Sequence, residues 1–185
     1  RGVASTGFTT LLVLTITWGL AGYSLSFAPS LGTTPHAGPS APVSTNLLNE
    51  LRNQEARTDL TSSMGRGGMI GNFDYFLFNQ FVPSGDQVRA GFSVGSAFRH
   101  LPHAQVFVYQ LSMMLAVSVA WVVSAARILS PPRAAVFGMV WLTLVYSPMV
   151  HWIWGNGWFS HQGGFDGGGG MLHLASAWTI LVLFR

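Results

Sequence analysis

The chain has 185 residues, of which 49% are hydrophobic and only 8% are charged, and its mean hydropathy is +0.40. Soluble domains carry about 25% charged residues, so this composition excludes an ordinary soluble protein and indicates a membrane protein. All nine positive charges are arginines scattered along the chain, which leaves no basic patch for nucleic acid, and there is no cysteine to form a disulfide bond.

The first predicted element is a membrane-spanning helix over residues 8–28, an apolar run long enough to cross about 30 Å of hydrocarbon. A loop over residues 29–102 follows, and its first part, residues 31–69, is rich in Pro, Gly, Ser, Thr and Asn, which favours a water-exposed surface segment. Within it, residues 47–60 have the composition of one short amphipathic helix. Residues 70–81 are aromatic but too short to span a membrane, so we expect an interfacial helix at headgroup depth.

Three further apolar runs predict membrane-spanning helices over residues 103–126, 134–154 and 169–184, the last of which is short for a full crossing. Residues 130–132 predict a tight turn between the first two of these helices, and Pro148 is expected to kink the second. The predicted fold class is therefore an all-α polytopic transmembrane protein with four spanning helices. Because the chain starts without Met and stops where an apolar segment has barely ended, we expect it to be a piece of a longer protein.

The placement of arginine sets the expected orientation in the membrane. If the first helix leaves the cytoplasm, four arginines without a neighbouring acid lie on the cytoplasmic side: Arg1, Arg127, Arg133 and Arg185. An aromatic cluster then lies at the outer interface, where such rings are favoured: Trp152, Trp154, Trp158 and Phe159. The loop over residues 29–102 is accordingly predicted to be extracytoplasmic.

The glycine-rich segment before the last span holds candidate binding groups. The four glycines at residues 167–170 are typical either of close approach between helices or of an outer vestibule whose backbone groups face water. Asp166 is expected to cap the following helix or to place a negative charge near a cation, and both roles can hold together. Trp154 is either a belt residue at the membrane interface or a π-face at a pore mouth that binds a small cation.

His173 is the sharpest functional candidate, because no acid or base lies near it until Arg185. A lone histidine in a helix is commonly a packed, hydrogen-bonded residue, but at membrane depth an ionisable group is costly and indicates a function. Imidazole exchanges protons near neutrality, and the helix neighbours are all apolar, so we expect His173 in a pore lumen, pointing away from lipid.

The other histidines carry weaker expectations. His151 is expected to be a hydrogen-bonded interface residue rather than a ligand. Four more histidines are expected to face solvent: His36, His100, His103 and His161. No paired spacing of His and carboxylate recurs, so no metal site is predicted.

Five motifs are distributed along the chain outside residues 31–66: GYSLSFA (22–28), GGMIGNFDYFLF (67–78), YQLSMM (109–114), WLTLVYSPMVHWIWGNGW (141–158) and GGFDGGGGMLHLASA (163–177). In order and spacing they resemble the ammonium transporter family, the Amt/Mep/Rh superfamily. The first three resemble the end of its second helix, its outer interfacial segment and the FQMM start of its third helix. The last two resemble its signatures WxTLVYxPxAHWxWGGG and GALDFAGGTVVHISSG. The resemblance implies helices two to five of an eleven-helix protein.

The resemblance implies roles for four residues at matching positions. Trp154 is similar to the tryptophan of the outer ammonium-recruitment site, and Tyr109 takes the place of a phenylalanine that gates the pore mouth. His173 is similar to the first of the twin pore histidines, and Asp166 to the acid below the recruitment site, which has a structural or electrostatic role. The chain departs from the family in the hydroxyl of Tyr109. It also departs in the seven rather than eight positions from Asp166 to His173, which put Phe165 at the family's Asp position.

The resemblance also implies a function. NH4+ would be recruited at an aromatic outer mouth, deprotonated, and conducted as NH3 while its proton is relayed along paired histidines. It implies a protein for nitrogen uptake that is not an enzyme and needs no cofactor, a homotrimer in the cell (plasma or inner) membrane, with a PII-type regulatory protein as cytoplasmic partner. The alternatives are a binding-only ammonium sensor of a signalling protein on the same fold and a structural membrane fragment without activity.

Overall fold

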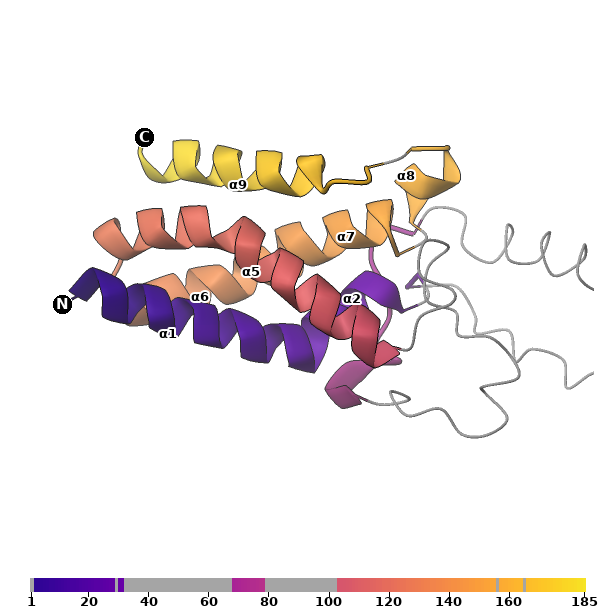
Figure 1. Ribbon diagram of the computed structural model, residues 1–185, viewed down its shortest axis with the longest axis horizontal. Helices are drawn as coiled ribbons and strands as arrows, with labels where there is room; N and C mark the ends of the chain where they lie inside the picture. The colour runs from indigo at the N-terminus through magenta and orange to yellow at the C-terminus, as the bar shows by residue number, and fades with distance from the viewer. Residues whose placement is uncertain (1, 29, 32–67, 79–102, 156, 165) are drawn as a thin grey trace, which may run out of the picture.

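The computed structural model describes residues 2–28, 30–31, 68–78, 103–155, 157–164 and 166–185 (Figure 1). In this part of the chain the elements are helices, and the β pairing is limited to an isolated antiparallel bridge between Ser30 and Gly71. The predicted all-α fold class is confirmed. The helix expected over residues 47–60, and the rest of its loop from residue 32 to 67, lie outside the described residues.

The first span, Gly2–Phe27, is one continuous helix. Its parts are α1 (Gly2–Thr17), a π-helical turn η1 (Trp18–Gly22) and α2 (Tyr23–Phe27). It begins at Gly2 rather than at residue 8. Short polar side chains can lie in this part of the helix because a hydroxyl group can bond to the backbone of its own helix. Thr6 is buried, and the Thr10 hydroxyl donates to the Thr6 carbonyl within the same helix, at 2.8 Å.

The second and third spans run in opposite directions and are joined by a tight turn (Figure 1). Their elements are α5 (His103–Ile128), α6 (Pro131–Trp141), a π-helical turn η3 (Leu142–Tyr146) and α7 (Ser147–Ile153). Pro131 is the first residue of α6, where its missing N–H costs nothing. Pro148 has no N–H to offer the Leu144 carbonyl, and the π-helical turn η3 accommodates this break directly before α7.

The last apolar helix is shorter than the others. The short helix α8 (Trp158–His161) leads toward α9 (Gly170–Leu183), which has 14 residues. At 1.5 Å per residue α9 is about 21 Å long, less than the hydrocarbon thickness of about 30 Å. Three described helices are long and apolar enough to cross a membrane: Gly2–Phe27, Ala104–Ile128 and Pro131–Ser160. The fourth predicted span is therefore a shorter apolar helix in the described chain, and it packs on the second and third spans.

The core of the bundle is aromatic, and its two π-helical turns face each other within it. The ring centroids of Trp18 and Tyr146, one from each turn, are 5.8 Å apart and meet edge to face. A Cβ on Gly22 would lie 2.7 Å from Leu142 Cδ2, so glycine is what permits this approach. The Gly22 carbonyl accepts a hydrogen bond from the Ser147 hydroxyl at 3.3 Å, which ties the first span to α7.

Two hydrogen bonds fix the position of α9 against the spanning helices. Trp141 Nε1 in α6 donates to Thr179 Oγ1 at 2.9 Å, and the Ser176 hydroxyl donates to the carbonyl of Val117 in α5 at 2.6 Å. Unpaired polar groups are costly in apolar surroundings, so these bonds between helices favour one position of α9 on the bundle. That position determines where the start of α9 lies.

The prediction of an interfacial helix over residues 70–81 is wrong for its described part, which ends at Phe78. This stretch is irregular, with one 3₁₀ turn, η2 (Phe76–Phe78). The last carbonyls of a helix have no partner within it. At the end of the first span, this stretch supplies a backbone N–H that donates to one of these carbonyls. Gly71 N donates to the Leu25 carbonyl at 2.7 Å. Bonds to the first span thus replace the bonds that a local helix would have made.

The ends of the helices divide into two groups. Figure 1 shows the start of α1, the α5–α6 turn and the end of α9 at one end of the bundle, with α2, η2 and α8 at the other. Arg127, Arg133 and Arg185 consequently share one end, as the predicted orientation requires. The membrane side that this end faces stays a prediction.

Candidate functional site

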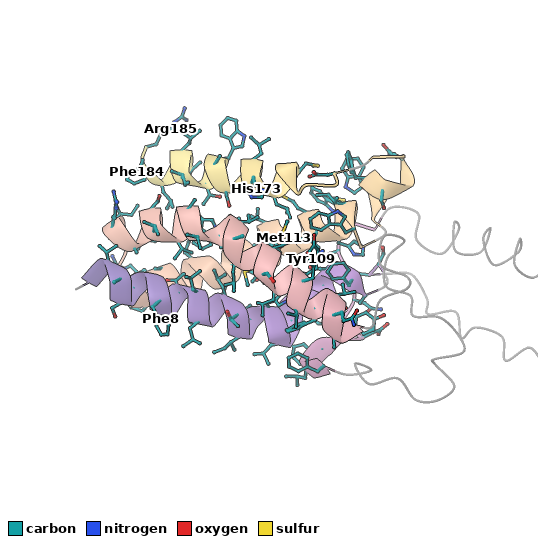
Figure 2. The ribbon with its side chains drawn as sticks, in the orientation of Figure 1. Phe8, Tyr109, Met113, His173, Phe184 and Arg185 are labelled. Carbon is teal, nitrogen blue, oxygen red and sulfur yellow. The ribbon has the colours of Figure 1, made fainter. Side chains whose placement is uncertain are left out.

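The four predicted site residues lie on three helices near the end of the bundle that carries α2, η2 and α8. Tyr109 is on α5, Trp154 is the C-cap of α7, Asp166 precedes α9 and His173 lies in α9. In Figure 2, Tyr109, Met113 and His173 follow one another from this end of the bundle inward. Hydrogen bonds tie three of the four residues to the turn and first residues of α9.

Trp154 joins the end of α7 to the turn before α9. Its backbone N–H donates to the Val150 carbonyl at 2.8 Å, in the last turn of the helix. Its indole Nε1 donates to the Asp166 carbonyl at 3.1 Å, and the ring is half-buried. The indole is therefore held in place by a hydrogen bond to the turn before α9.

Asp166 caps α9 with both carboxylate oxygens. Oδ1 accepts from Gly170 N at 2.9 Å and Oδ2 accepts from Met171 N at 2.8 Å, the first two amides of the helix. The expected capping role is confirmed, although Gly169, not Asp166, occupies the formal N-cap position. The seven-position spacing to His173 thus still lets the carboxylate reach the positive end of α9. The carboxylate is partly exposed, so its charge is also felt outside the helix.

Gly169 makes the turn into α9 and brings three helices together. Its φ of 69° is in the left-handed region, which favours glycine. A Cβ there would lie 3.2 Å from Met113 Cε on α5, a tight distance, and 3.4 Å from Trp154 Cη2, an ordinary van der Waals distance, so a larger residue would displace the Met113 side chain. The sequence suggests either close approach between helices or a water-facing vestibule for the glycine run. Gly169 fits close approach, whereas the preceding glycine, Gly168, is exposed and has open space around it.

His173 presents one ring nitrogen to its own helix. Nδ1 lies 2.9 Å from the Gly169 carbonyl, to which the His173 backbone N–H also donates, at 3.1 Å. A carbonyl can only accept, so Nδ1 carries the proton, and in the neutral ring Nε2 is left as the acceptor. The side chain is exposed with respect to the described helices. An imidazole with a directed lone pair therefore lies one helical turn after Gly169.

Tyr109 and Met113 share one face of α5, because they are four residues apart in a helix. Tyr109 is 51% exposed, and the Met113 side chain lies near Gly169, since a Cβ on that glycine would be 3.2 Å from Met113 Cε. Met113 is not among the predicted site residues, and its i, i+4 spacing from Tyr109 is the signal in the sequence that identifies it. The face of α5 with these two side chains thus borders the turn at Gly169.

His151 is buried and hydrogen-bonded through both ring nitrogens, as expected for an interface residue. Nε2 lies 3.0 Å from Ser30 Oγ, and Nδ1 lies 3.0 Å from the Ser26 carbonyl. The expectations for the four other histidines fall on residues or side chains outside the described set: His36, His100, His103 and His161. In the described part of the chain, no three His, Asp or Glu side chains come together as metal ligands would.

Comparison with known proteins gives a consistent family. Residues 3–184 match the family model described as Ammonium Transporter Family. The chain is 30% identical over 94 residues to an ammonium transporter of Bacillus subtilis, a match that covers 50% of this chain and 23% of that protein. It is 38% identical over 77 residues to ammonium transporter Amt1 of Archaeoglobus fulgidus, covering 40% and 19%. It is 34% identical over 125 residues to ammonium transporter 2 of Schizosaccharomyces pombe, covering 65% and 22%.

A solved structure shares the fold. The crystal structure of Saccharomyces cerevisiae Mep2 matches 98% of this chain with a TM-score of 0.65 and 23% sequence identity, and the match covers 32% of the Mep2 chain. The chain spans about a quarter or less of the length of the curated relatives, between 19% and 23%. The helices described above therefore correspond to one part of a larger helical membrane protein.

Proposed function

This chain belongs to the Ammonium Transporter Family, and we propose that it supplies the outer mouth and the first pore histidine of a protein that carries ammonium across a membrane. The relatives are named as ammonium transporters, and transporters are not enzymes. We further propose a homotrimer in the plasma or inner membrane that serves nitrogen uptake, with a PII-type protein acting on its cytoplasmic side.

One observation carries the proposal: an aromatic ring, a carboxylate and an imidazole are each hydrogen-bonded to the short stretch that begins α9. Trp154 donates to the main-chain carbonyl of Asp166, and the Asp166 carboxylate caps the helix in which His173 lies. His173 in turn donates Nδ1–H to the carbonyl of Gly169, the residue directly before α9. A cation-attracting mouth and a proton acceptor are thereby fixed relative to each other.

The proposed mechanism assigns one step to each group. An ammonium ion binds at the π-face of Trp154, where the negative charge of Asp166 adds to the attraction. Tyr109 borders the entrance as the mouth gate. An ion that reaches His173 transfers a proton to the Nε2 lone pair and continues as NH3, while the resulting imidazolium releases a proton along the pore to a second histidine. The Nδ1–H bond to Gly169 keeps the lone pair of the neutral ring on Nε2.

The experiment uses the full-length protein in proteoliposomes and measures ammonium-driven current and saturable flux. Trp154→Leu is expected to raise KM about 2- to 30-fold, since a cation–π contact is worth roughly 0.5–2 kcal/mol. Trp154→Phe keeps a π-face but loses the bond to the Asp166 carbonyl, so its KM should lie between those of the wild type and Trp154→Leu. Trp178→Leu is the control, because Trp178 is 60% exposed on α9 and lies away from the mouth.

The alternative of a binding-only sensor gives a different result in the same assay. Saturable ammonium binding without flux in the full-length protein would overturn transport and support sensing. The names of the relatives do not favour that alternative.

A further inference from the structure

We infer that His151 is a positioning residue for the mouth: it clamps the end of α7 to the end of the first span and so holds Trp154 in place. The inference rests on the proposed role of Trp154, three positions later. It concerns a buried imidazole that the proposed mechanism does not use.

Both nitrogens of His151 are committed to partners far away in the chain. The side chain is 0% exposed. Nδ1 faces the Ser26 carbonyl at 3.0 Å, and since a carbonyl only accepts, Nδ1 carries the proton. In the neutral ring Nε2 is then the acceptor for the Ser30 hydroxyl, also at 3.0 Å. His151 therefore has no free lone pair for ammonium, in contrast with His173. Its side chain instead links α7 to the end of the first span.

The clamp satisfies the end of a helix inside an apolar protein. α2 ends at Phe27, so the carbonyls of its last turn lack partners in their own helix. Leu25 O receives Gly71 N at 2.7 Å, and Ser26 O receives the His151 ring. Leaving a carbonyl unpaired in apolar surroundings costs free energy, so this bond favours one position of α7 relative to the first span.

The residues after His151 transmit this position to Trp154. The His151 carbonyl accepts from Gly155 N at 3.1 Å and from Gly157 N at 2.9 Å, which ends α7 and forms the turn that carries Trp154. A Cβ on Gly155 would lie 2.8 Å from His151 Nδ1 and would collide with Ser26 O. Glycine at this position is thus a requirement of the clamp. Trp154 lies within the segment that these bonds to the His151 carbonyl close.

The test compares variants of the full-length protein by flux in proteoliposomes and by thermal midpoint. His151→Leu removes both bonds. We expect the KM for ammonium to rise about tenfold, which corresponds to ~1.4 kcal/mol, with maximal flux changed less. His151→Asn keeps an amide donor for Ser26 O and should recover most of the loss. Ser30→Ala removes only the Nε2 partner and should give a smaller rise, which keeps the test open if His151→Leu does not assemble.

A double-mutant cycle with Trp154→Leu separates positioning from general stability. If His151 acts through Trp154, then His151→Leu adds little to KM once Trp154 is leucine. Additive KM effects, an unchanged KM in His151→Leu, or failure of His151→Asn to recover affinity would overturn the inference while leaving the role of Trp154 intact. An unchanged KM in Trp154→Leu alone would instead overturn the proposed mouth, and the inference with it.

Discussion

Replacing Asp166 by alanine is expected to loosen the first turn of α9, because the carboxylate accepts from both Gly170 N and Met171 N. Loss of a capping side chain costs about 0.5–2 kcal/mol. Loss of a negative charge at a helix start adds about 0.3–1 kcal/mol. The carboxylate is partly exposed and so partly screened, which favours the lower part of these ranges. A total of about 1–2 kcal/mol corresponds to roughly a 5- to 30-fold change in a local opening equilibrium.

Hydrogen exchange measured by mass spectrometry on the full-length protein reads this opening directly. Asp166→Ala should speed exchange in the peptide that begins at Gly170 by about 5- to 30-fold. Asp166→Asn keeps one acceptor oxygen without the charge, and should give a smaller increase. Asp74→Ala is the control, because Asp74 bonds to Asn72 and not to α9. Equal exchange in Asp166→Ala and wild type, or equal effects of Asp166→Ala and Asp74→Ala, would refute the capping account.

Two further predictions concern packing and orientation. Gly71→Ala should lower the thermal midpoint and the yield of assembled protein, because the new Cβ would lie 2.7–2.9 Å from three carbonyl oxygens at the end of the first span, those of Ser24, Leu25 and the C-cap residue Ala28; Gly168→Ala, with open space around it, should not. Cysteines placed at Ser130 and Ser160 should react with an impermeant reagent from inside and from outside respectively, and labelling of Ser130 from outside would reverse the orientation.

The features that sequence reasoning reached are those set by local composition. The apolar runs predict the helices because their length and hydrophobicity alone decide whether they can cross a membrane. The capping role of Asp166 was also within reach, because its partners lie only four and five residues away. A proline marks the break that η3 accommodates, because a missing N–H is visible in the sequence.

The features that it missed depend on partners distant in sequence. The aromatic run at residues 70–78 has the composition of an interfacial helix. Its form is decided instead by hydrogen bonds to the end of the first span, such as Tyr75 N to the Ser24 hydroxyl at 3.0 Å. The bonds of His151 join residues 121 and 125 positions apart. No local pattern encodes such pairs, so the clamp and the proximity of Met113 to Gly169 became visible only in the folded chain.

The central claim is that His173 takes a proton from ammonium inside the pore. The most direct test measures ammonium-driven current and ion selectivity of His173→Ala in proteoliposomes of the full-length protein, with assembly checked by size-exclusion chromatography. The account predicts that the variant assembles as wild type does while its ammonium conductance is lost or altered. His173→Asp should keep ion passage with poorer selectivity against K+, because a fixed charge replaces a neutral acceptor. Wild-type rate and selectivity in His173→Ala would contradict the relay and make His173 a packing residue.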